Sequence, residues 1–198
     1  SARARGRRPR LPPARRARVL RRWVATHDRG GLAPDPLPAE GVAWVERTLL
    51  GTGHHTGARF TWADTCIRRW RDALYLLPAR HDQGTAPAGH WRLSWDGLGP
   101  LALPQGGSLA LEGADGFDRT LFVCSRRGGE RIRLPGRAHR HTLKHVLQDH
   151  GVPPWVRARM PLLVDGKGEL LAAGDAVVAG TFAVWLDARG ARLRWHRD

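Results

Sequence analysis

Apolar residues in the first part of the chain recur with helical spacing and then with strand spacing. In residues 12–27 they return every three or four positions while arginines take another face, which predicts an amphipathic helix. The same spacing predicts a second helix over residues 39–50. Alternating apolar and polar residues then predict a strand at 58–62 and a hairpin at 65–78. Residues 11–79 are therefore expected to form a small helix-helix-hairpin domain.

The pattern changes in the middle of the chain. Residues 80–90 are polar and rich in Gly, Pro and Ala, which is typical of a linker. Over residues 91–198, short apolar segments separated by Gly or Pro predict many short strands and one main helix at about 140–149. The last hairpin is expected to turn at residues 189–190. The predicted fold class is α+β: the helix-helix-hairpin domain is followed by a mixed α+β domain of short strands with one main helix.

The main helix of the second domain has a clear apolar face. Leu143, Val146, Leu147 and His150 share the side that we expect to point inward. Gly151 follows directly and is suited to end the helix, because glycine tolerates the left-handed conformation found there.

The net charge of +15 is concentrated in two segments. Residues 1–22 hold ten arginines and no acidic residue, and residues 126–159 hold eight arginines and one lysine against two acidic residues. Such clustering suggests a polyanionic partner, because each neutralised phosphate releases counterions. A GC-rich genome would account for 31 arginines against 2 lysines, but it would not account for the clustering. Residues 1–10 are predicted to be a basic, disordered arm.

Two sets of basic residues are candidate RNA contacts. In the first helix, Arg15, Arg18 and Arg22 share one face, where guanidinium groups could contact phosphates bidentately. The alternative is an ordinary solvated helix face. The second set surrounds the main helix of the second domain and comprises Arg131, Arg133, Arg137, Lys144, Arg157 and Arg159. Trp155 stands among them, and its alternatives are a core position and a platform for a stacked base.

Other functional classes receive little support. Cys66 and Cys124 are isolated and predict reduced thiols, and the chain has neither a long apolar run nor a signal peptide, so we expect a cytoplasmic protein. His139, His141 and His145 have spacing that could bind zinc, but no H-E-x-x-H pattern accompanies them. No nucleophile elbow or nucleotide-binding loop is present, so no catalytic residue is predicted.

The run GERIRLPGR…HTLKHVLQDHGVPPWVRARMPLLVDGKGELLAAGD resembles the C-terminal domain of the tRNA(Ile)-lysidine synthetase family. The upstream LPPARRARVLRRWV…IRRWRDALYLLP is similar to the middle, substrate-binding domain of the same family. The resemblance implies a cytosolic bacterial ligase that adenylates the wobble cytidine of a tRNA for isoleucine with ATP and then joins it to lysine. It assigns ATP, Mg²⁺ and an S-G-G-x-D-S loop to an N-terminal catalytic domain. This sequence has no such loop and begins at Ser1, which we interpret as truncation.

The resemblance also implies that tRNA binding and catalysis belong to different domains. The two basic domains would hold the tRNA body and the acceptor stem, with no cofactor of their own, and a second copy of the chain is a further candidate partner. The matching basic positions include Lys144, but the residue after it is His145, where the family often carries another basic residue. Two other functions stay open: a stand-alone basic RNA-binding protein without enzymatic activity, and a His-dependent metalloenzyme.

Overall fold

A computed structural model describes residues 2–5, 12–27, 34–50, 58–71, 73–79 and 89–197 of the chain. The chain forms two compact units, residues 1–83 and 84–198. The boundary between them falls within the segment that the sequence predicts as a linker. In the part of the chain that is described, no helix has the length and apolar character needed to cross a membrane.

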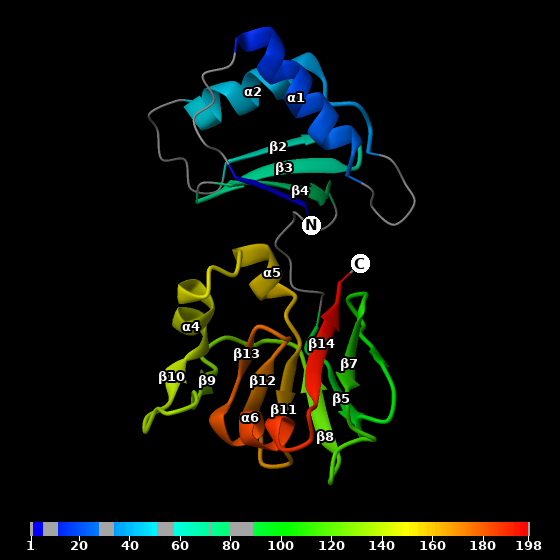
Figure 1. Cartoon of the computed structure of the whole chain (residues 1–198), viewed down its shortest axis with the longest axis vertical. Coiled ribbons are helices and arrows are strands. Elements are labelled where there is room, and N and C mark those ends of the chain that lie inside the picture. Colours follow the sequence, from blue (N-terminus) through cyan, green and yellow to red (C-terminus); the bar gives the residue numbers. More distant parts are fainter. Residues whose placement is uncertain are drawn as a thin grey trace. The chain divides into compact units, whose positions relative to one another are not determined.

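The first unit packs two helices on one face of an antiparallel sheet (Figure 1). Its elements in chain order are β1 (Ala2–Arg5), α1 (Pro13–Ala25), α2 (Ala39–Leu50), β2 (Arg59–Trp62), β3 (Thr65–Trp70) and β4 (Ala73–Pro78). The strand order is β1-β4-β3-β2. Val24 of α1 and Val45 of α2 pack with Ile67 of β3 in the core between the helices and the sheet. Both predicted helices and the β3–β4 hairpin are confirmed.

Strand β1 corrects the expectation of a disordered arm for four of its residues. Ala2–Arg5 pair with β4 in antiparallel register, with Ala2 opposite Leu76 and Arg5 opposite Ala73. The free edge of β4 would otherwise expose a row of unpaired backbone groups, and an alternating segment can satisfy them. Residues 1 and 6–10 of the predicted arm lie outside the described residues.

The second unit is built from short strands and short helices. Its strands are β5 (Arg92–Trp95), β6 (Leu101–Ala102), β7 (Ser108–Glu112), β8 (Leu121–Cys124), β9 (Arg131–Ile132), β10 (His141–Thr142), β11 (Leu162–Val164), β12 (Leu170–Ala173), β13 (Val177–Val178) and β14 (Arg192–His196). Its helices are α4 (Leu143–Asp149), α5 (Pro154–Ala158) and α6 (Gly180–Asp187). The larger sheets have the orders β13-β12-β11-β8-β5 and β14-β7-β6, and β9 pairs with β10. The α+β class is confirmed in both units.

Helix α6 replaces the first arm of the predicted last hairpin. The residues before the turn at 189–190 are aromatic and β-branched and favour strands as isolated segments. As a helix, however, they place Phe182 and Leu186 in the core, one turn apart, and stack Phe182 on Trp185 with ring centroids 5.6 Å apart. The following strand, β14, pairs with the distant β7. Tertiary packing therefore overrides local propensity here.

Helix α4 ends where the sequence predicts, but it begins at Leu143 and not at about residue 140, because His141–Thr142 form β10. Leu143, Val146 and Leu147 are buried as expected, whereas His150 is exposed and takes the C-cap position. Gly151 has φ of +67°, and its N–H donates to the carbonyl of Gln148 while the N–H of Val152 donates to that of Leu147. This is a Schellman ending. It fixes the direction of the chain into α5, which begins at the Pro153-Pro154 pair.

Candidate nucleic-acid interface

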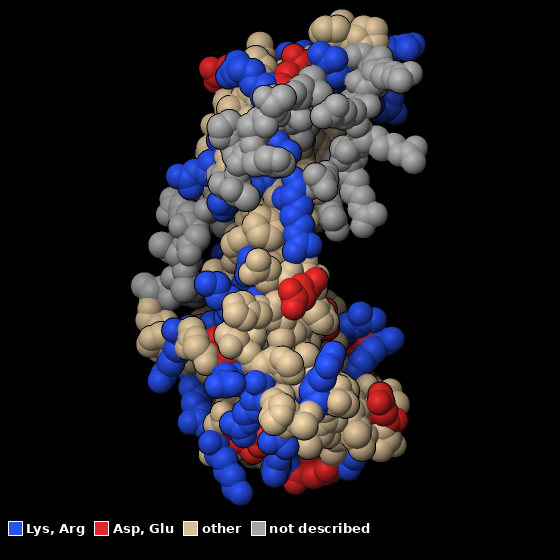
Figure 2. All heavy atoms as spheres, turned by 90° about the vertical axis from the view of Figure 1, so that its left-hand side faces the viewer, with Lys and Arg blue, Asp and Glu red and all other residues tan. Residues whose placement is uncertain are grey.

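Four of the predicted RNA-contact residues are exposed and come from one short segment of the second unit, residues 131–144. Strand β9 pairs with β10, with Arg131 opposite Thr142, and β10 continues directly into α4. The arrangement gathers four exposed cations, which we call the hairpin face: Arg131, Arg133, Arg137 and Lys144. On the side of the second unit that carries β9, β10 and α4, basic side chains cover more of the surface than acidic ones, although acidic side chains are also visible (Figure 2). A surface of this kind suits phosphate contacts that do not depend on base sequence.

Further basic residues, which were not predicted as contacts, are exposed in the same part of the chain as the hairpin face. Arg127 precedes β9, and Arg140 precedes β10 and pairs with Glu169 at 3.1 Å. The guanidinium of Arg131 donates to the carbonyl of Arg140 at 3.1 Å, which orients the two residues together. Both additional arginines lie in the basic segment 126–159. The distribution of charge along the sequence does not show which cations of that segment are exposed.

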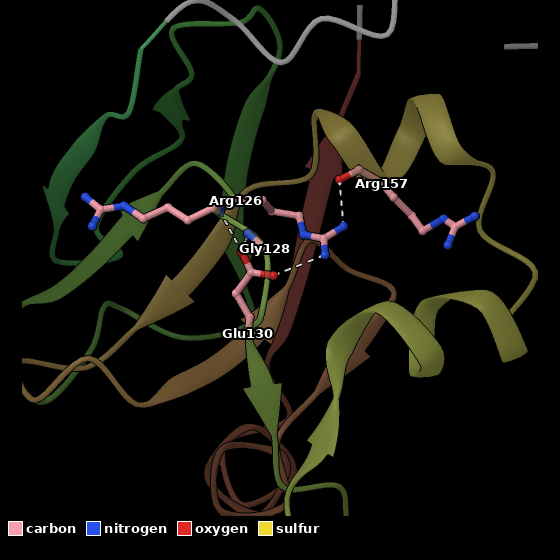
Figure 3. Close-up of polar contacts among 5 residues, drawn as sticks. Arg126, Gly128, Glu130 and Arg157 are labelled. Atoms are coloured by element: carbon pink, nitrogen blue, oxygen red, sulfur yellow. Dashed lines mark hydrogen bonds and ion pairs between the residues drawn. The ribbon is translucent and has the colours of Figure 1, made fainter.

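One acidic residue is embedded among these cations (Figure 3). Glu130 accepts hydrogen bonds from the backbone N–H groups of Arg127 at 2.6 Å and Gly128 at 2.7 Å, and it forms an ion pair with Arg126 at 3.1 Å. Arg126 in turn donates to the backbone carbonyl of Arg157 in α5 at 3.2 Å. The network joins the loop before β9 to α5.

The electrostatic state of Glu130 follows from these contacts. Burial raises the pKa of its carboxyl, but the two backbone hydrogen bonds and the charge of Arg126 outweigh that effect and hold the pKa below its ordinary value. Glu130 is therefore ionised at neutral pH. Its charge is matched by donors within the protein.

The two arginines after the proline pair are half-buried. Arg159 donates from its guanidinium to the backbone carbonyl of Gln105, and the Gln105 side chain donates back to the carbonyl of Arg159 at 3.2 Å. Arg159 therefore fastens the turn between β6 and β7. The carbonyl of Arg157 takes part in the Glu130 network, and its side chain extends away from Arg126 (Figure 3). Their contact with RNA stays a prediction.

Trp155 belongs to the core. It is 5% exposed and packs at the start of α5. This burial supports the core position over the base-stacking platform, because a platform must present a ring face to the ligand.

The arginines of the first unit form a separate basic surface. Arg15, Arg18 and Arg22 are exposed on α1 at positions that share one side of a helix, and we call this set the α1 face. The sequence offers no nearby acid for α1, yet Glu46 of α2 reaches Arg16 at 3.1 Å. That pair ties α1 to α2 beside the α1 face. Whether the α1 face contacts RNA stays a prediction.

The predicted alternative of a metal centre finds no support in the described residues. Among them, no group of three or more His, Cys, Asp or Glu side chains could hold a metal ion. His139, His141 and His145 are exposed on the hairpin side of the unit. Cys66 and Cys124 are free thiols, and burial raises the pKa of Cys124 despite the nearby arginines Arg92 and Arg127.

Two family models match the chain and define the class of protein. The model of the TilS substrate binding domain matches residues 10–75, and the model of the TilS substrate C-terminal domain matches residues 121–195. The matches fall in the first and second structural units respectively. The first unit therefore corresponds to the TilS substrate binding domain and the second to the TilS substrate C-terminal domain.

Curated relatives carry the name tRNA(Ile)-lysidine synthase. The relative from Xylella fastidiosa (strain 9a5c) is 53% identical over 93% of this chain and 41% of its own length. The relative from Xanthomonas campestris pv. campestris (strain 8004) is 51% identical over 92% of this chain and 40% of its own length. The chain belongs to the tRNA(Ile)-lysidine synthase family, of which it carries the substrate-binding and C-terminal domains. It spans about two-fifths of the length of these relatives.

A solved structure also resembles the chain. It is described as the crystal structure of the TILS C-terminal domain and is 21% identical, with a TM-score of 0.41. The match covers 54% of this chain and 98% of that one.

Proposed function

We propose that the chain is the tRNA-binding part of a tRNA(Ile)-lysidine synthase. In this proposal the two units hold the body and the acceptor stem of tRNA(Ile), so that its wobble cytidine can be converted to lysidine with ATP and lysine. The ATP and Mg²⁺ belong to the catalytic domain of the family, and the setting is the bacterial cytoplasm. The names of the relatives and the matched substrate-binding domains support this assignment.

The observation that carries the proposal is the hairpin face. Arg131, Arg133, Arg137 and Lys144 are all exposed and come from one short pair of strands, their connecting loop and the helix that follows. Double-stranded RNA is recognised mostly through its phosphates, its 2′-hydroxyls and its A-form shape, so such a face does not need to read base edges. Guanidinium groups suit this task because they can contact phosphate oxygens bidentately.

The proposal is tested by binding of the full chain to an unmodified tRNA(Ile) transcript across a series of salt concentrations. We expect the affinity to fall steeply with salt, with a log–log slope of roughly 0.7–0.9 for each phosphate contact. The double variant Arg131→Gln/Arg133→Gln should bind more weakly and show a slope smaller by about 1–2. An affinity that does not depend on salt would contradict the proposal.

A matched control comes from β14. Arg192 and Arg194 are also exposed on one strand, and both contact Glu112, at 2.7 Å and 3.4 Å. The double variant Arg192→Gln/Arg194→Gln removes the same charge as the hairpin-face variant. We expect it to lose much less affinity. Equal losses in the two variants would mean that net charge, and not the hairpin face, governs binding.

A further inference from the structure

We propose that Glu130 is a positioning residue for RNA binding: although it is negative, it holds the cationic segments of the hairpin face in place. Removing its charge should therefore weaken binding to a polyanion. The inference rests on the tRNA-binding function proposed above, and it adds a specific role for an acidic residue within that surface.

The side chain of Glu130 shapes the loop that precedes β9. One carboxylate oxygen accepts the N–H groups of both Arg127 and Gly128, and the other pairs with Arg126. Gly128 and Gly129 have φ of +89° and +78°, a conformation that residues other than glycine rarely adopt. The carboxylate thus closes a tight turn and fixes the backbone from which the exposed Arg127 projects.

The same residue connects three further segments. Its backbone carbonyl accepts the N–H of Leu143 at 2.9 Å, which fixes the start of α4. Its chain neighbour Arg131 begins β9. Through Arg126, whose second nitrogen donates to the carbonyl of Arg157, the network reaches the last turn of α5. The loop, β9, α4 and α5 therefore all meet at Glu130.

Simple electrostatics predicts the opposite effect of removing this acid. Neutralising Glu130 raises the net charge by one, and a more positive surface attracts a polyanion more strongly. Two observations argue against that outcome here. The side chains of Glu130 and Arg126 are only 14% and 15% exposed, and the carboxylate already accepts three donors. Its charge is compensated locally, while the order that it imposes reduces the entropy lost on binding.

A matched pair of variants separates the two effects. Glu130→Gln and Glu169→Gln make the same chemical replacement and the same change in net charge. Glu169 pairs with Arg140 on the same unit, but its side chain is 46% exposed and makes no contact to the loop before β9 among those described. Loss of its carboxylate should release Arg140 without moving the backbone.

Binding of each variant of the whole 198-residue chain to an unmodified tRNA(Ile) transcript gives the readout. We expect Glu169→Gln to bind up to about threefold more tightly than the wild type, since an exposed ion pair contributes little. We expect Glu130→Gln to bind roughly five- to tenfold more weakly and with a smaller salt slope. Binding by Glu130→Gln as tight as that of the wild type, or tighter, would overturn the inference. If the wild type itself does not bind, the tRNA-binding function fails, and the inference fails with it.

A second pair of variants tests the inference independently, in case Glu130→Gln does not fold. Arg126→Gln and Arg127→Gln each remove one positive charge from neighbouring positions, but only the Arg126 side chain bonds both to Glu130 and to α5. Arg126→Gln should lose more affinity than Arg127→Gln and should speed hydrogen exchange at the amide of Leu143. If Arg127→Gln loses as much affinity or more, the positioning role is overturned even when Glu130→Gln does not fold.

Discussion

The two basic surfaces of the molecule are constructed in different ways. The α1 face lies on one regular helix, where Arg15, Arg18 and Arg22 are displayed by helical periodicity alone. The hairpin face is assembled from a loop, two very short strands and the start of a helix. The first needs only helix formation, whereas the second needs a network that fixes several segments at once.

This difference shows where acidic residues are useful on a basic surface. Beside the α1 face, Glu46 pairs with Arg16 and links α1 to α2 through a contact between two side chains. In the hairpin face, Glu130 binds backbone N–H groups and so determines the path of the chain. An acid of the second kind can support binding of a polyanion, while an acid of the first kind joins one helix to its neighbour.

The largest effect on stability should come from shortening a core side chain in the helix that carries each surface. Leu147 of α4 and Val24 of α1 are each 0% exposed. Leu147→Ala should lower the free energy of unfolding by about 2–5 kcal/mol, because it removes buried methyl groups and leaves a cavity. Val24→Ala should cost roughly 2 kcal/mol, since it removes fewer atoms. Urea unfolding measures the loss.

Segment-resolved hydrogen exchange gives the control for this pair. We expect faster exchange in the second unit for Leu147→Ala and in the first unit for Val24→Ala, because each side chain belongs to a separate core cluster. Uniform acceleration over both units would show that the two cores unfold together, and the comparison of independent surfaces would no longer hold.

The next largest effect concerns charge. We expect Arg131→Gln/Arg133→Gln to weaken tRNA binding more than Arg15→Gln/Arg18→Gln, although each removes two positive charges. The guanidinium of Arg131 already donates to the carbonyl of Arg140, whereas no side-chain contact is described for Arg15 or Arg18, so Arg131 should lose less rotamer freedom on binding. Fluorescence anisotropy with a labelled tRNA(Ile) transcript gives both affinities. A larger loss in the α1-face variant would reverse the proposed ranking.

Regular elements were predictable from the sequence because periodicity reports burial. The helix over residues 39–50, the buried face of α4 and the glycine ending at Gly151 all follow from local patterns. The exposed positions of Arg131 and Arg133 also agree with the alternation expected of a strand. In these cases each residue's environment depends on neighbours within a few positions of the chain.

Long-range partners were not predictable in the same way. Helix α6 forms because helical spacing buries both Phe182 and Leu186 in the core. Local propensity does not include this tertiary packing. Strand β1 depends on the free edge of β4, more than sixty residues away. The role proposed for Glu130 depends on Arg126 reaching α5, whereas the sequence shows only that Glu130 and Asp149 are acidic residues in a basic segment. When a site is built from loops, its residues can be assigned only after the three-dimensional structure shows which segments come together.

Acid should weaken the hairpin face in a specific pH range. Because the pKa of Glu130 is lowered in the folded state by its backbone hydrogen bonds and Arg126, its ionised form stabilises the fold above the pKa that it has when unfolded. That contribution is lost as the pH falls through the lowered, folded-state pKa. Unfolding of the second unit followed at pH values below the ordinary glutamate pKa of 4.5 should show the loss. The Glu130→Gln variant should have a flatter pH dependence, and an identical dependence would contradict this account.

The smallest effects should appear at the ends of the two helices that carry the surfaces. Gly151 ends α4 with φ of +67°, so Gly151→Ala forces a side chain into a strained backbone and should cost about 1 kcal/mol. Thr26 ends α1 with ordinary helical geometry, and its hydroxyl donates to the carbonyl of Arg22 at 2.9 Å. Thr26→Ala should cost only about 0.5 kcal/mol, because this exposed carbonyl can bond to water instead. Thermal unfolding of both variants measures the difference. If the two variants lose the same stability, the backbone at residue 151 can adopt another conformation without strain. The hairpin face would then be less rigid than its hydrogen bonds indicate.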